Sequence, residues 1–367
     1  MSRIDDLIAE LCPDGVPHRA LDQVVAFQKG EQLKAEDRID GPYPVVTAGR
    51  TNESTHQEFN FGAGSVSVSS HGAYAGHINY WAEPIWLSNN VFLLAPSVPH
   101  LESRFLFFAL KSRQQRVRDR VHGGGVPYLN ARDLAPLRIP VPPLEVQREI
   151  VRVLDQFTQL EAELEAELEA RRRQYEHYQR SLLAVGSSVE NIPMGEIAAI
   201  GTGRTDRKDA TADGAFPLYV RSKDVLASDK WEFDETAIIL PGEGGIGEIF
   251  HFAAGKYALH QRAYRVAPHD TRILPRFLYF YLRENFGDYV RQRAVTATVT
   301  SLRRSMLTDF PVPLLPLEEQ TRVVEALDQL DALVNDISVG LPAELAARRK
   351  QYEYYRDKLL TFEEAAA

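Results

Sequence analysis

Cysteine is almost absent from this chain, and so are long apolar runs. Cys12 is the single cysteine among 367 residues, which excludes an internal disulfide and is typical of a reducing compartment. No apolar run approaches the roughly 18 residues that a membrane-spanning helix requires, and the charged opening at residues 1–6 is unlike a signal peptide. We therefore expect a soluble, cytoplasmic protein.

The motifs of several enzyme classes are also missing. No His/Cys cluster has zinc spacing, no phosphate-binding Gly-Lys-Ser/Thr sequence occurs, and no Gly-x-Ser-x-Gly elbow accompanies the glycine run at residues 123–125. Residues 61–64 are similar to an S-adenosylmethionine loop, but the Asn/Asp-Pro-Pro-Tyr motif that would hold a flipped adenine is lacking. The sequence thus predicts no catalytic residue, metal or cofactor in this chain.

One apparent nucleotide motif is better explained as a turn. Residues 242–247 satisfy Gly-x-Gly-x-x-Gly, whose phosphate-binding form must be followed by a helix. Residues 248–252 instead alternate between apolar and polar, as in a strand. A tight turn is therefore the favoured interpretation.

Positive charge is outnumbered overall but concentrated locally. The formal net charge is −9, which is unusual for a nucleic-acid-binding protein. Acidic residues dominate 144–170 and 318–344, whereas basic clusters lie at 111–120 and 291–304. The acidity belongs to these two connecting segments, so the parts between them remain free to bind a polyanion.

The chain nearly repeats itself after 173 residues. Pro143-Leu144-Glu145 returns as Pro316-Leu317-Glu318, and Leu154-Asp155-Gln156 returns as Leu327-Asp328-Gln329. This period is far longer than the 20–50 residues of a solenoid repeat, so it indicates two whole domains related by an approximate twofold. Such a protein most naturally contacts something that also has two halves.

Each repeat predicts a domain that mixes helix and strand. Residues 66–69 and 77–81 alternate as half-buried strands do, and 104–121 have helical spacing. Residues 191–315 retrace this plan. The expected fold class is α+β, with two tandem mixed α/β domains separated by a pair of long antiparallel coiled-coil helices in a pseudo-twofold repeat. We place an arm at 1–17, domains at 18–141 and 187–314, connectors at 142–186 and 315–362, and a tail at 363–367.

Both connectors have the heptad-like spacing of long helices, and prolines mark both starts. A helix over 144–182 would be about 57 Å long. Pro342 should kink or interrupt the second connector. Residues 160–170 repeat Leu-Glu-Ala-Glu, and each such unit would lengthen the helix by about 6 Å. The tandem is either a harmless extension of an acidic face or a ruler that sets domain separation.

The paired motifs resemble those of the specificity subunit of type I restriction-modification enzymes. In that family two domains are each followed by Pro-Leu-Glu-x-Gln, here at 143–147 and 316–320, and by a helix that ends Arg-Arg-x-Gln-Tyr-Glu-x-Tyr, here at 171–178 and 348–355. The opening at residues 7–16 is also similar, so the resemblance covers essentially the whole chain.

This resemblance implies that each domain recognises one half of a bipartite target in double-stranded DNA. It also implies that the helices set the spacer and dock two methyltransferase subunits, and that motor-nuclease subunits join the full complex. S-adenosylmethionine, ATP and Mg²⁺ are then expected on those partners. The Leu-Glu-Ala-Glu tandem is similar to spacer-setting repeats in the family, which favours the ruler.

The candidate DNA contacts are predicted from residue chemistry alone. Polar and basic side chains on loops can reach base edges and phosphates, although an ordinary solvated loop is the alternative for any one of them. In the first domain the candidates are Arg50, Thr51, Asn52, Ser70, His71, Tyr74, His122, Gly124, Tyr128, Asn130 and Arg132. In the second they are Arg204, Arg207, Lys208, Arg221, Ser222, Lys223, His260, Gln261, Arg262, Thr298, Thr300, Arg303 and Arg304.

Further cations on expected helices, at 113–120 and 291–293, either contact phosphates or are solvated. On the connectors, tyrosines continue the heptad seam, which favours packing at the helix pair or a partner interface over base stacking. The predicted partner-binding residues are Leu144, Gln147, Tyr175, Tyr178, Leu317, Gln320, Tyr352 and Tyr355.

Two other functions remain open at this point. A coiled-coil adaptor that binds only proteins would share the connectors, but it would not need basic loops. A self-contained methyltransferase would need the catalytic motif that the sequence lacks.

Overall fold

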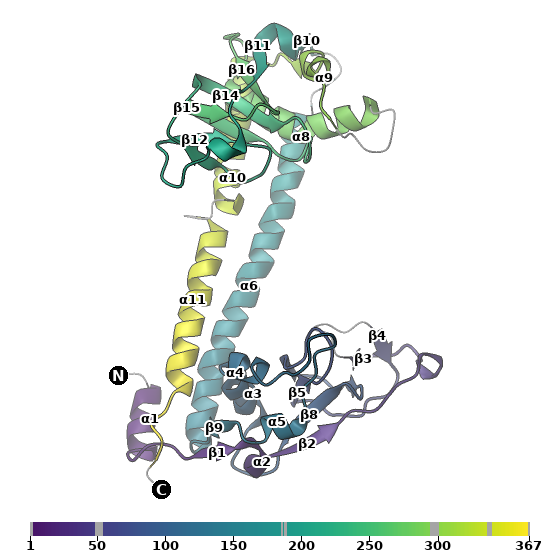
Figure 1. Ribbon diagram of the computed structural model, residues 1–367, viewed down its shortest axis with the longest axis vertical. Helices are drawn as coiled ribbons and strands as arrows, with labels where there is room; N and C mark the ends of the chain where they lie inside the picture. The colour runs from purple at the N-terminus through teal and green to yellow at the C-terminus, as the bar shows by residue number, and fades with distance from the viewer. Residues whose placement is uncertain are drawn as a thin grey trace. The chain divides into compact units, whose positions relative to one another are not determined.

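The computed structural model of this protein describes residues 3–47, 54–184, 186, 189–293, 301–335 and 340–365 (Figure 1). The chain divides into two compact units. The first unit comprises residues 1–164 and 345–367, and the second comprises residues 165–344. The 40-residue helix α6 (Leu144–Leu183) supplies residues to both units. The predicted helix over 144–182 is therefore confirmed, as is the α+β class with a tandem repeat.

The described residues of the first unit form three small sheets. All pairs are antiparallel except β3 with β7. The predicted strands at 66–69 and 77–81 are confirmed as β5 and β6. The sheets are β1 (His18–Ala20) with β9 (Arg138–Pro140); β2 (Val25–Lys29), β8 (Val91–Pro96), β5 (Ser65–Ser69) and β6 (Ile78–Trp81) in that order; and β4 (Ser54–His56), β3 (Tyr43–Val46) and β7 (Trp86–Leu87).

Helix α3 (Ser103–Lys111) covers the four-stranded sheet with its apolar face. Phe105 and Phe108 are buried against Val66 and Ile78 in the core of this unit. The single helix predicted over 104–121 is wrong, because the chain forms α3 and then the separate short helix α4 (Gln114–Arg118). Arg113, at the junction, leaves the helical region with φ −106° and ψ 18°. The described part of this unit also contains the helices α1 (Arg3–Leu11), α2 (Leu21–Val24) and α5 (Ala131–Leu134).

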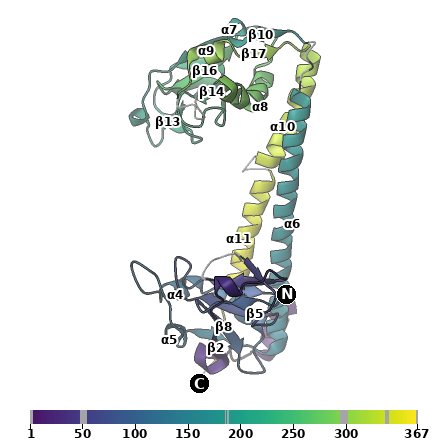
Figure 2. The same ribbon diagram turned by 90° about the vertical axis from the view of Figure 1, so that its right-hand side faces the viewer.

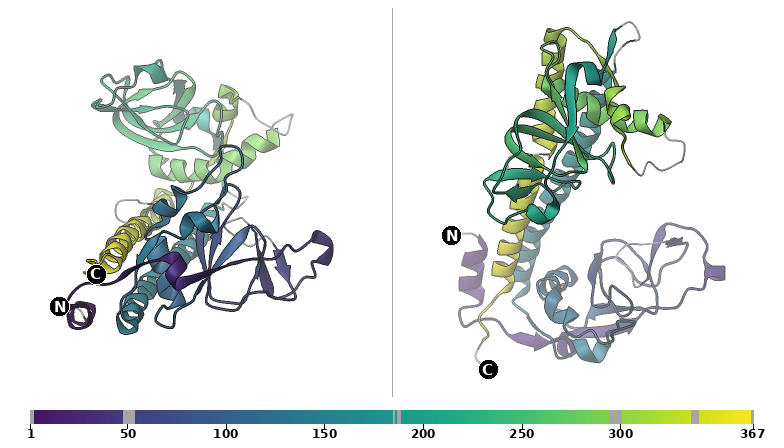
Figure 3. Two further views of the ribbon diagram at one scale, coloured as in Figure 1. Left: turned by 60° about the horizontal axis from the view of Figure 1, so that its bottom comes forward. Right: turned by 45° about the horizontal axis from the view of Figure 1, so that its top comes forward.

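The second unit repeats this plan with a more continuous sheet. The strand order is β11, β16, β14, β15, β12, β13, and among these described strands β12 with β15 is the one parallel pair. Helix α8 (Pro275–Arg293) is unbroken and lies along one side of the sheet (Figure 2, Figure 3). The strands are β10 (Asn191–Pro193), β11 (Ala198–Thr202), β12 (Phe216–Tyr219), β13 (Leu226–Ser228), β14 (Phe233–Pro241), β15 (His251–Leu259), β16 (Ala263–Pro268) and β17 (Pro311–Pro313), with β10 paired to β17; the short helices are α7 (Met194–Ile197) and α9 (Arg304–Thr308).

Each unit also contains an antiparallel helix pair, as predicted. In the first, Phe157 of α6 stacks on Tyr355 of α11 (Leu341–Leu360) with ring centroids 5.5 Å apart. One turn further along α6, Glu161 pairs with Arg349, which lies earlier in α11, so the two helices run in opposite directions. In the second, the hydroxyl of Tyr175 donates to Asp331 of α10 (Leu317–Asn335) at 3.1 Å.

The second connector is interrupted, as Pro342 predicts. Helix α10 ends at Asn335, and α11 begins at Leu341 with Pro342 in its first turn, where a proline costs no backbone hydrogen bond. In the described ranges, no helix is both long enough and apolar enough to cross a membrane.

The segment before β1 and the segment after α11 are joined by backbone hydrogen bonds. The amide of Val16 donates to the carbonyl of Glu363 at 2.9 Å, and the amide of Ala365 donates back to Val16 at 3.1 Å. Arg138 of β9 pairs with Glu364. The segment that follows α11 is therefore part of the first unit.

Candidate nucleic-acid interface

In the first domain, a narrow loop gathers several of the predicted residues. His122 and Tyr128 exchange two backbone hydrogen bonds of 2.8 Å, and their rings lie 5.5 Å apart. Tyr128 also forms a bridge with His71, whose ring nitrogen Nδ1 is 2.9 Å from the hydroxyl of Ser70. The structure therefore brings together Ser70, His71, His122 and Tyr128, four residues that are up to 58 positions apart in the sequence.

The tip of this loop is the glycine run. Gly123 has a φ of +90°, which other residues rarely adopt. A β-carbon added at Gly124 would meet nothing within 4 Å, so the fold does not require a glycine there. The exposed backbone of Gly124 leaves room for the close approach of a ligand.

Below the tip, Asn130 and Asp133 form a reciprocal cap at the start of α5. The amide of Asn130 donates to Asp133 at 2.8 Å, and this bond, aided by His122, lowers the pKa of the Asp133 carboxyl. The carboxylate lies 3.1 Å from Nε2 of His122. Arg132 is exposed on α5, and Tyr74 is 41% exposed. The predicted residues Arg50, Thr51 and Asn52 lie outside the described residues.

In the second domain, the first cluster forms where two loops meet. Thr205 and His260 form a bridge, and the amide of Gln261 donates to the carbonyl of Thr205 at 2.9 Å. The amide of Arg204 donates to Glu232 at 2.9 Å, which fixes the backbone while the Arg204 side chain remains exposed. Arg207 and Lys208 are exposed in the single turn that follows.

The second cluster is a triad of charged side chains. Nη1 of Arg221 and Nη1 of Arg262 both donate to Oε2 of Glu243, at 2.9 and 3.2 Å. Glu243 was not among the predicted residues, because an acid is not an obvious choice for a surface that binds a polyanion. Its only sequence signal is its place inside the glycine motif at 242–247.

His260 lies beneath this triad and is buried. Burial, followed by the charge of Arg221, lowers the pKa of the His260 imidazole, so it is neutral at neutral pH. Its Nδ1 accepts a hydrogen bond of 3.0 Å from the backbone amide of Arg262. His260 therefore orders the loop rather than presenting a ring to the surface.

The glycine motif is a turn, as predicted. Gly244, Gly245 and Gly247 all have positive φ, and no helix follows them. The turn is anchored at Gly242, whose amide donates to Arg262 at 2.8 Å and whose carbonyl accepts from Leu302 at 2.7 Å. The exposed Arg303 and Arg304 come directly after Leu302 in the sequence. The predicted residues Ser222 and Lys223 come directly after Arg221. The predicted Thr298 and Thr300 lie outside the described residues.

The cations on helices have varied surroundings. Arg116 and Arg118 are exposed on α4, whereas Arg113 is half-buried. In the second domain Arg291 pairs with Asp288, and Arg293 lies 3.8 Å from the centre of the Tyr289 ring. The Asp288 carboxylate therefore reduces the net charge that Arg291 presents to a ligand.

Two predicted partner-binding residues prove to be internal. The Gln147 side chain accepts from the amide of Glu102 at 3.0 Å and donates to the carbonyls of His100 and Pro142, both at 2.7 Å. Gln320 makes the equivalent bonds, each of 2.8 Å, to the amide of Leu274 and the carbonyls of Arg272 and Leu315. Both side chains are wholly buried, so the prediction that they contact a partner is wrong.

An ion pair accompanies each glutamine. Arg104 of α3 pairs with Asp155 of α6, and Arg276 of α8 pairs with Asp328 of α10 at 2.7 Å. Each guanidinium also lies over aromatic rings, including Tyr80 for Arg104 at 4.3 Å. The sequence repeat already marked these four residues, because residues 104–106 recur as 276–278 and residues 154–156 recur as 327–329.

The remaining connector residues differ in exposure. Tyr175 is buried, and burial raises the pKa of its hydroxyl. Leu144 and Tyr352 are half-buried. Tyr178, Tyr355 and Leu317 are 44%, 37% and 46% exposed, so these three remain available to a partner.

No cluster of three His, Cys, Asp or Glu side chains suited to a metal ion occurs among the residues that the structure describes.

The comparisons with known proteins agree on the family. The family model for the type I restriction modification DNA specificity domain matches twice, at residues 13–170 and 187–347.

Individual relatives carry related descriptions. The chain is 34% identical to the EcoR124I/EcoR124II specificity subunit of Escherichia coli over 61% of this chain and 63% of that protein. It is 28% identical to a putative type I restriction enzyme specificity subunit of Haemophilus influenzae over 95% and 96% of the two chains. The crystal structure of an S subunit from M. genitalium has the same fold, with a TM-score of 0.70 at 20% identity over 94% and 96% of the two chains. This chain therefore belongs to the family of type I restriction-modification specificity subunits and contains two copies of its domain.

Proposed function

We propose that this protein is the DNA-reading subunit of a type I restriction-modification complex. Each domain recognises one half of a bipartite duplex target through its loop cluster. The connectors set the spacer between the half-sites and dock two methyltransferase subunits, and motor-nuclease subunits complete the assembly. S-adenosylmethionine, ATP and Mg²⁺ belong to those partners, the chain itself contributes no catalytic group, and the complex works in the cytoplasm.

The observation that carries this proposal is that both domains are fastened to the connectors in one way. Gln147 with Arg104, and Gln320 with Arg276, join the first turns of a connector helix to the loop and helix that precede it. A reader that must place two recognition loops at a fixed spacing needs rigid joints of this kind, because a loose joint would allow many spacers.

The chemistry of the two loop clusters also supports DNA reading. The first offers His122, Tyr128 and an open glycine tip, whereas the second offers Arg221 and Arg262 held by Glu243. Guanidinium, imidazole and amide groups are the usual readers of base edges and phosphates. Because the two sets of residues differ, the two half-sites should differ as well.

A domain exchange tests this proposal. Residues ~20–140 would be replaced by the matching domain of a relative with a known target, and the chain would be assembled with its methyltransferase subunits. The methylated sequence should change in one half-site and remain the same in the other. If the exchange changed both half-sites at once, the proposal would be contradicted. If the protein bound no duplex DNA in a mobility-shift assay, an adaptor that binds only proteins would be favoured.

Docking can be tested on the exposed connector residues. Leu317→Asp should reduce copurification of the methyltransferase subunits while leaving the fold intact, because Leu317 is 46% exposed and lies at the first position of α10. Gln329→Asp, at another exposed position of α10, is the matched control. Equal copurification of both variants would remove Leu317 from the docking surface.

A further inference from the structure

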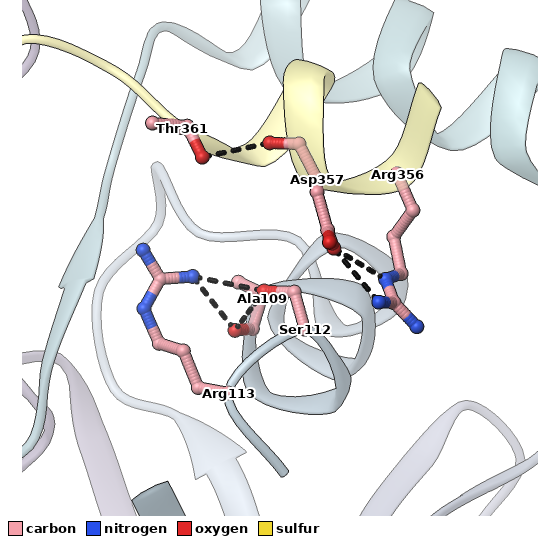
Figure 4. A network of polar contacts seen from close by, with 6 residues as sticks. All are labelled: Ala109, Ser112, Arg113, Arg356, Asp357 and Thr361. Atoms are coloured by element: carbon pink, nitrogen blue, oxygen red, sulfur yellow. Dashed lines mark hydrogen bonds and ion pairs between the residues drawn. The ribbon is translucent and has the colours of Figure 1, made fainter. Parts of the chain in front are cut away.

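A cavity of about 490 Å³ lies in the first unit, beside the end of α11. Its wall is built from separate parts of the chain: β1, the junction of α3 and α4, β9, the last turn of α11 and the segment that follows it. Figure 4 shows part of this wall, with Arg113 on one side and Asp357 and Thr361 on the other. The charged and titratable residues that line it are His18, Arg113, Arg116, Arg138, Asp357 and Glu364.

Both carboxylates on the wall already have cationic partners. Asp357 accepts two hydrogen bonds from Arg356, at 2.9 and 2.7 Å. Glu364 pairs with Arg138, which also donates to the carbonyl of His18 at 2.7 Å. These pairs leave no acid on the wall to balance the two remaining arginines.

Arg113 is held in place by neutral acceptors only. Its Nη1 donates to the carbonyl of Ala109 and to the hydroxyl of Ser112, both at 3.0 Å (Figure 4). Within the described ranges, no carboxylate lies within ion-pairing distance of Arg113 or Arg116. Burial and the nearby charge of Arg116 lower the pKa of the Arg113 guanidinium. A half-buried cation beside a second cation is unfavourable unless an anion offsets it.

The matching position in the second unit has the opposite chemistry. The shift of 172 residues that carries Arg104 onto Arg276 also carries Arg113 onto Asn285 and Arg116 onto Asp288. There, Glu284 lies 3.7 Å from Arg180. The arginine pair is therefore not repeated at the equivalent position of the second unit, and a partner that docks in two equivalent copies cannot use it twice.

We propose that this cavity binds one phosphate group carried by a small diffusible molecule. The two unmatched guanidinium groups supply about two positive charges, which balance a phosphate monoester of charge about −1.5 to −2 but exceed a single carboxylate. A planar guanidinium presents paired donors that suit phosphate oxygens. The cavity volume is in the range of small-molecule sites, and Leu360 and Phe362 give the wall an apolar part for an organic group.

The ligand would join segments that are distant in the sequence. Arg113 and Arg116 belong to the first domain, whereas Asp357 and Leu360 lie in the last turn of α11 and residues 361–364 follow that helix. Occupancy would therefore fasten the end of α11 to the first domain. This inference does not depend on DNA recognition.

Equilibrium dialysis of the full-length protein with radiolabelled inorganic phosphate, at constant ionic strength in chloride, tests the proposal. We expect saturable binding of one phosphate per chain. Arg113→Gln and Arg116→Gln should each weaken it at least tenfold. Arg118→Gln is the matched control, because Arg118 is exposed on the same helix but is absent from the wall, and it should change the affinity less than twofold.

Three outcomes would overturn the proposal: no saturable phosphate binding, equal affinity in all three variants, or displacement of phosphate by duplex DNA. In the last case Arg113→Gln would also reduce the slope of log affinity for DNA against log salt by about 1, which identifies a DNA backbone contact. Thermal unfolding checks that each variant is folded, and the exposed Arg116 provides a test if Arg113→Gln is unstable. Duplex binding by the same preparations reports separately on the proposed DNA-reading function.

Discussion

Gln147 and Gln320 make the same three hydrogen bonds, although 173 residues separate them in the chain. In both, the amide oxygen accepts from a backbone N–H and the amide nitrogen donates to two backbone carbonyls. Both side chains are fully buried at the start of a connector helix. The glutamine of each Pro-Leu-Glu-x-Gln motif is therefore a joint between helix and domain.

Removing this joint should destabilise the first domain. Gln147→Leu would leave one backbone donor and two acceptors without these partners, so we expect the free energy of unfolding to fall by about 3 kcal/mol. Gln156→Leu, at an exposed position of the same helix, should change it by less than about 0.5 kcal/mol. Urea unfolding of the two variants measures the difference, and equal losses would show that the buried bonds contribute nothing special.

Glu243 should restrain DNA binding while improving its discrimination. The Glu243 carboxylate orients Arg221 and Arg262 but also repels phosphates. Glu243→Gln should therefore raise the affinity for random duplex DNA several-fold. It should also lower the ratio of the affinity for the specific target to the affinity for random duplex. Fluorescence anisotropy at fixed salt measures both affinities. Glu248→Gln, an exposed acid next to the same turn, is the control. An unchanged ratio of specific to random affinity would rule out a role for Glu243 in discrimination.

Stability should depend on pH through His260. The folded state lowers the pKa of His260 below its ordinary 6.5, so between these values the unfolded chain binds a proton that the folded chain does not. The contribution of His260 is therefore complete above pH ~6.5 and is lost as the pH falls toward the folded pKa. His260→Asn keeps an acceptor near the Arg262 amide but does not titrate. Denaturant titrations from pH 5 to 7 should show a flatter profile for this variant, and parallel profiles would contradict the prediction.

The length of α6 should set the spacer of the DNA target. Deleting residues 164–167 removes one Leu-Glu-Ala-Glu unit, which shortens the helix by about 6 Å and leaves its faces rotated by only about 40°. The flanking Leu160 and Leu168 keep the spacing of the seam. Methylome sequencing should then show the same half-sites with a shorter gap. The substitution of Glu163, Glu165 and Glu167 by Gln is a control for charge, and an unchanged gap in the deletion would leave the tandem as a plain solvated face.

The elements that sequence predicted well are those with local causes. Prolines and heptad spacing marked the start of α6 and the interruption at Pro342, and alternation marked β5 and β6. The break between α3 and α4 was not predictable. The matching segment of the second domain, which has the apolar Phe286 and Val290 where the first has Gln114 and Arg118, forms the unbroken α8.

The side-chain contacts at the candidate sites depend on pairs that are distant in the chain. The repeat showed that Gln147 and Gln320 matter, but periodicity alone does not say whether a polar side chain points outward or toward backbone groups of another segment. Glu243 was missed for a related reason. Its two arginine partners lie 22 and 19 residues away, on separate loops.

The division of the chain into units has a consequence for biosynthesis. The second unit is contiguous, whereas the core of the first includes Leu359 and Leu360, which follow the second unit in the sequence. On the ribosome, the domain that is translated first must therefore wait for the last helix before its hydrophobic core closes. The domain that is translated later can complete its own core earlier, so the order of maturation is the reverse of the order of synthesis.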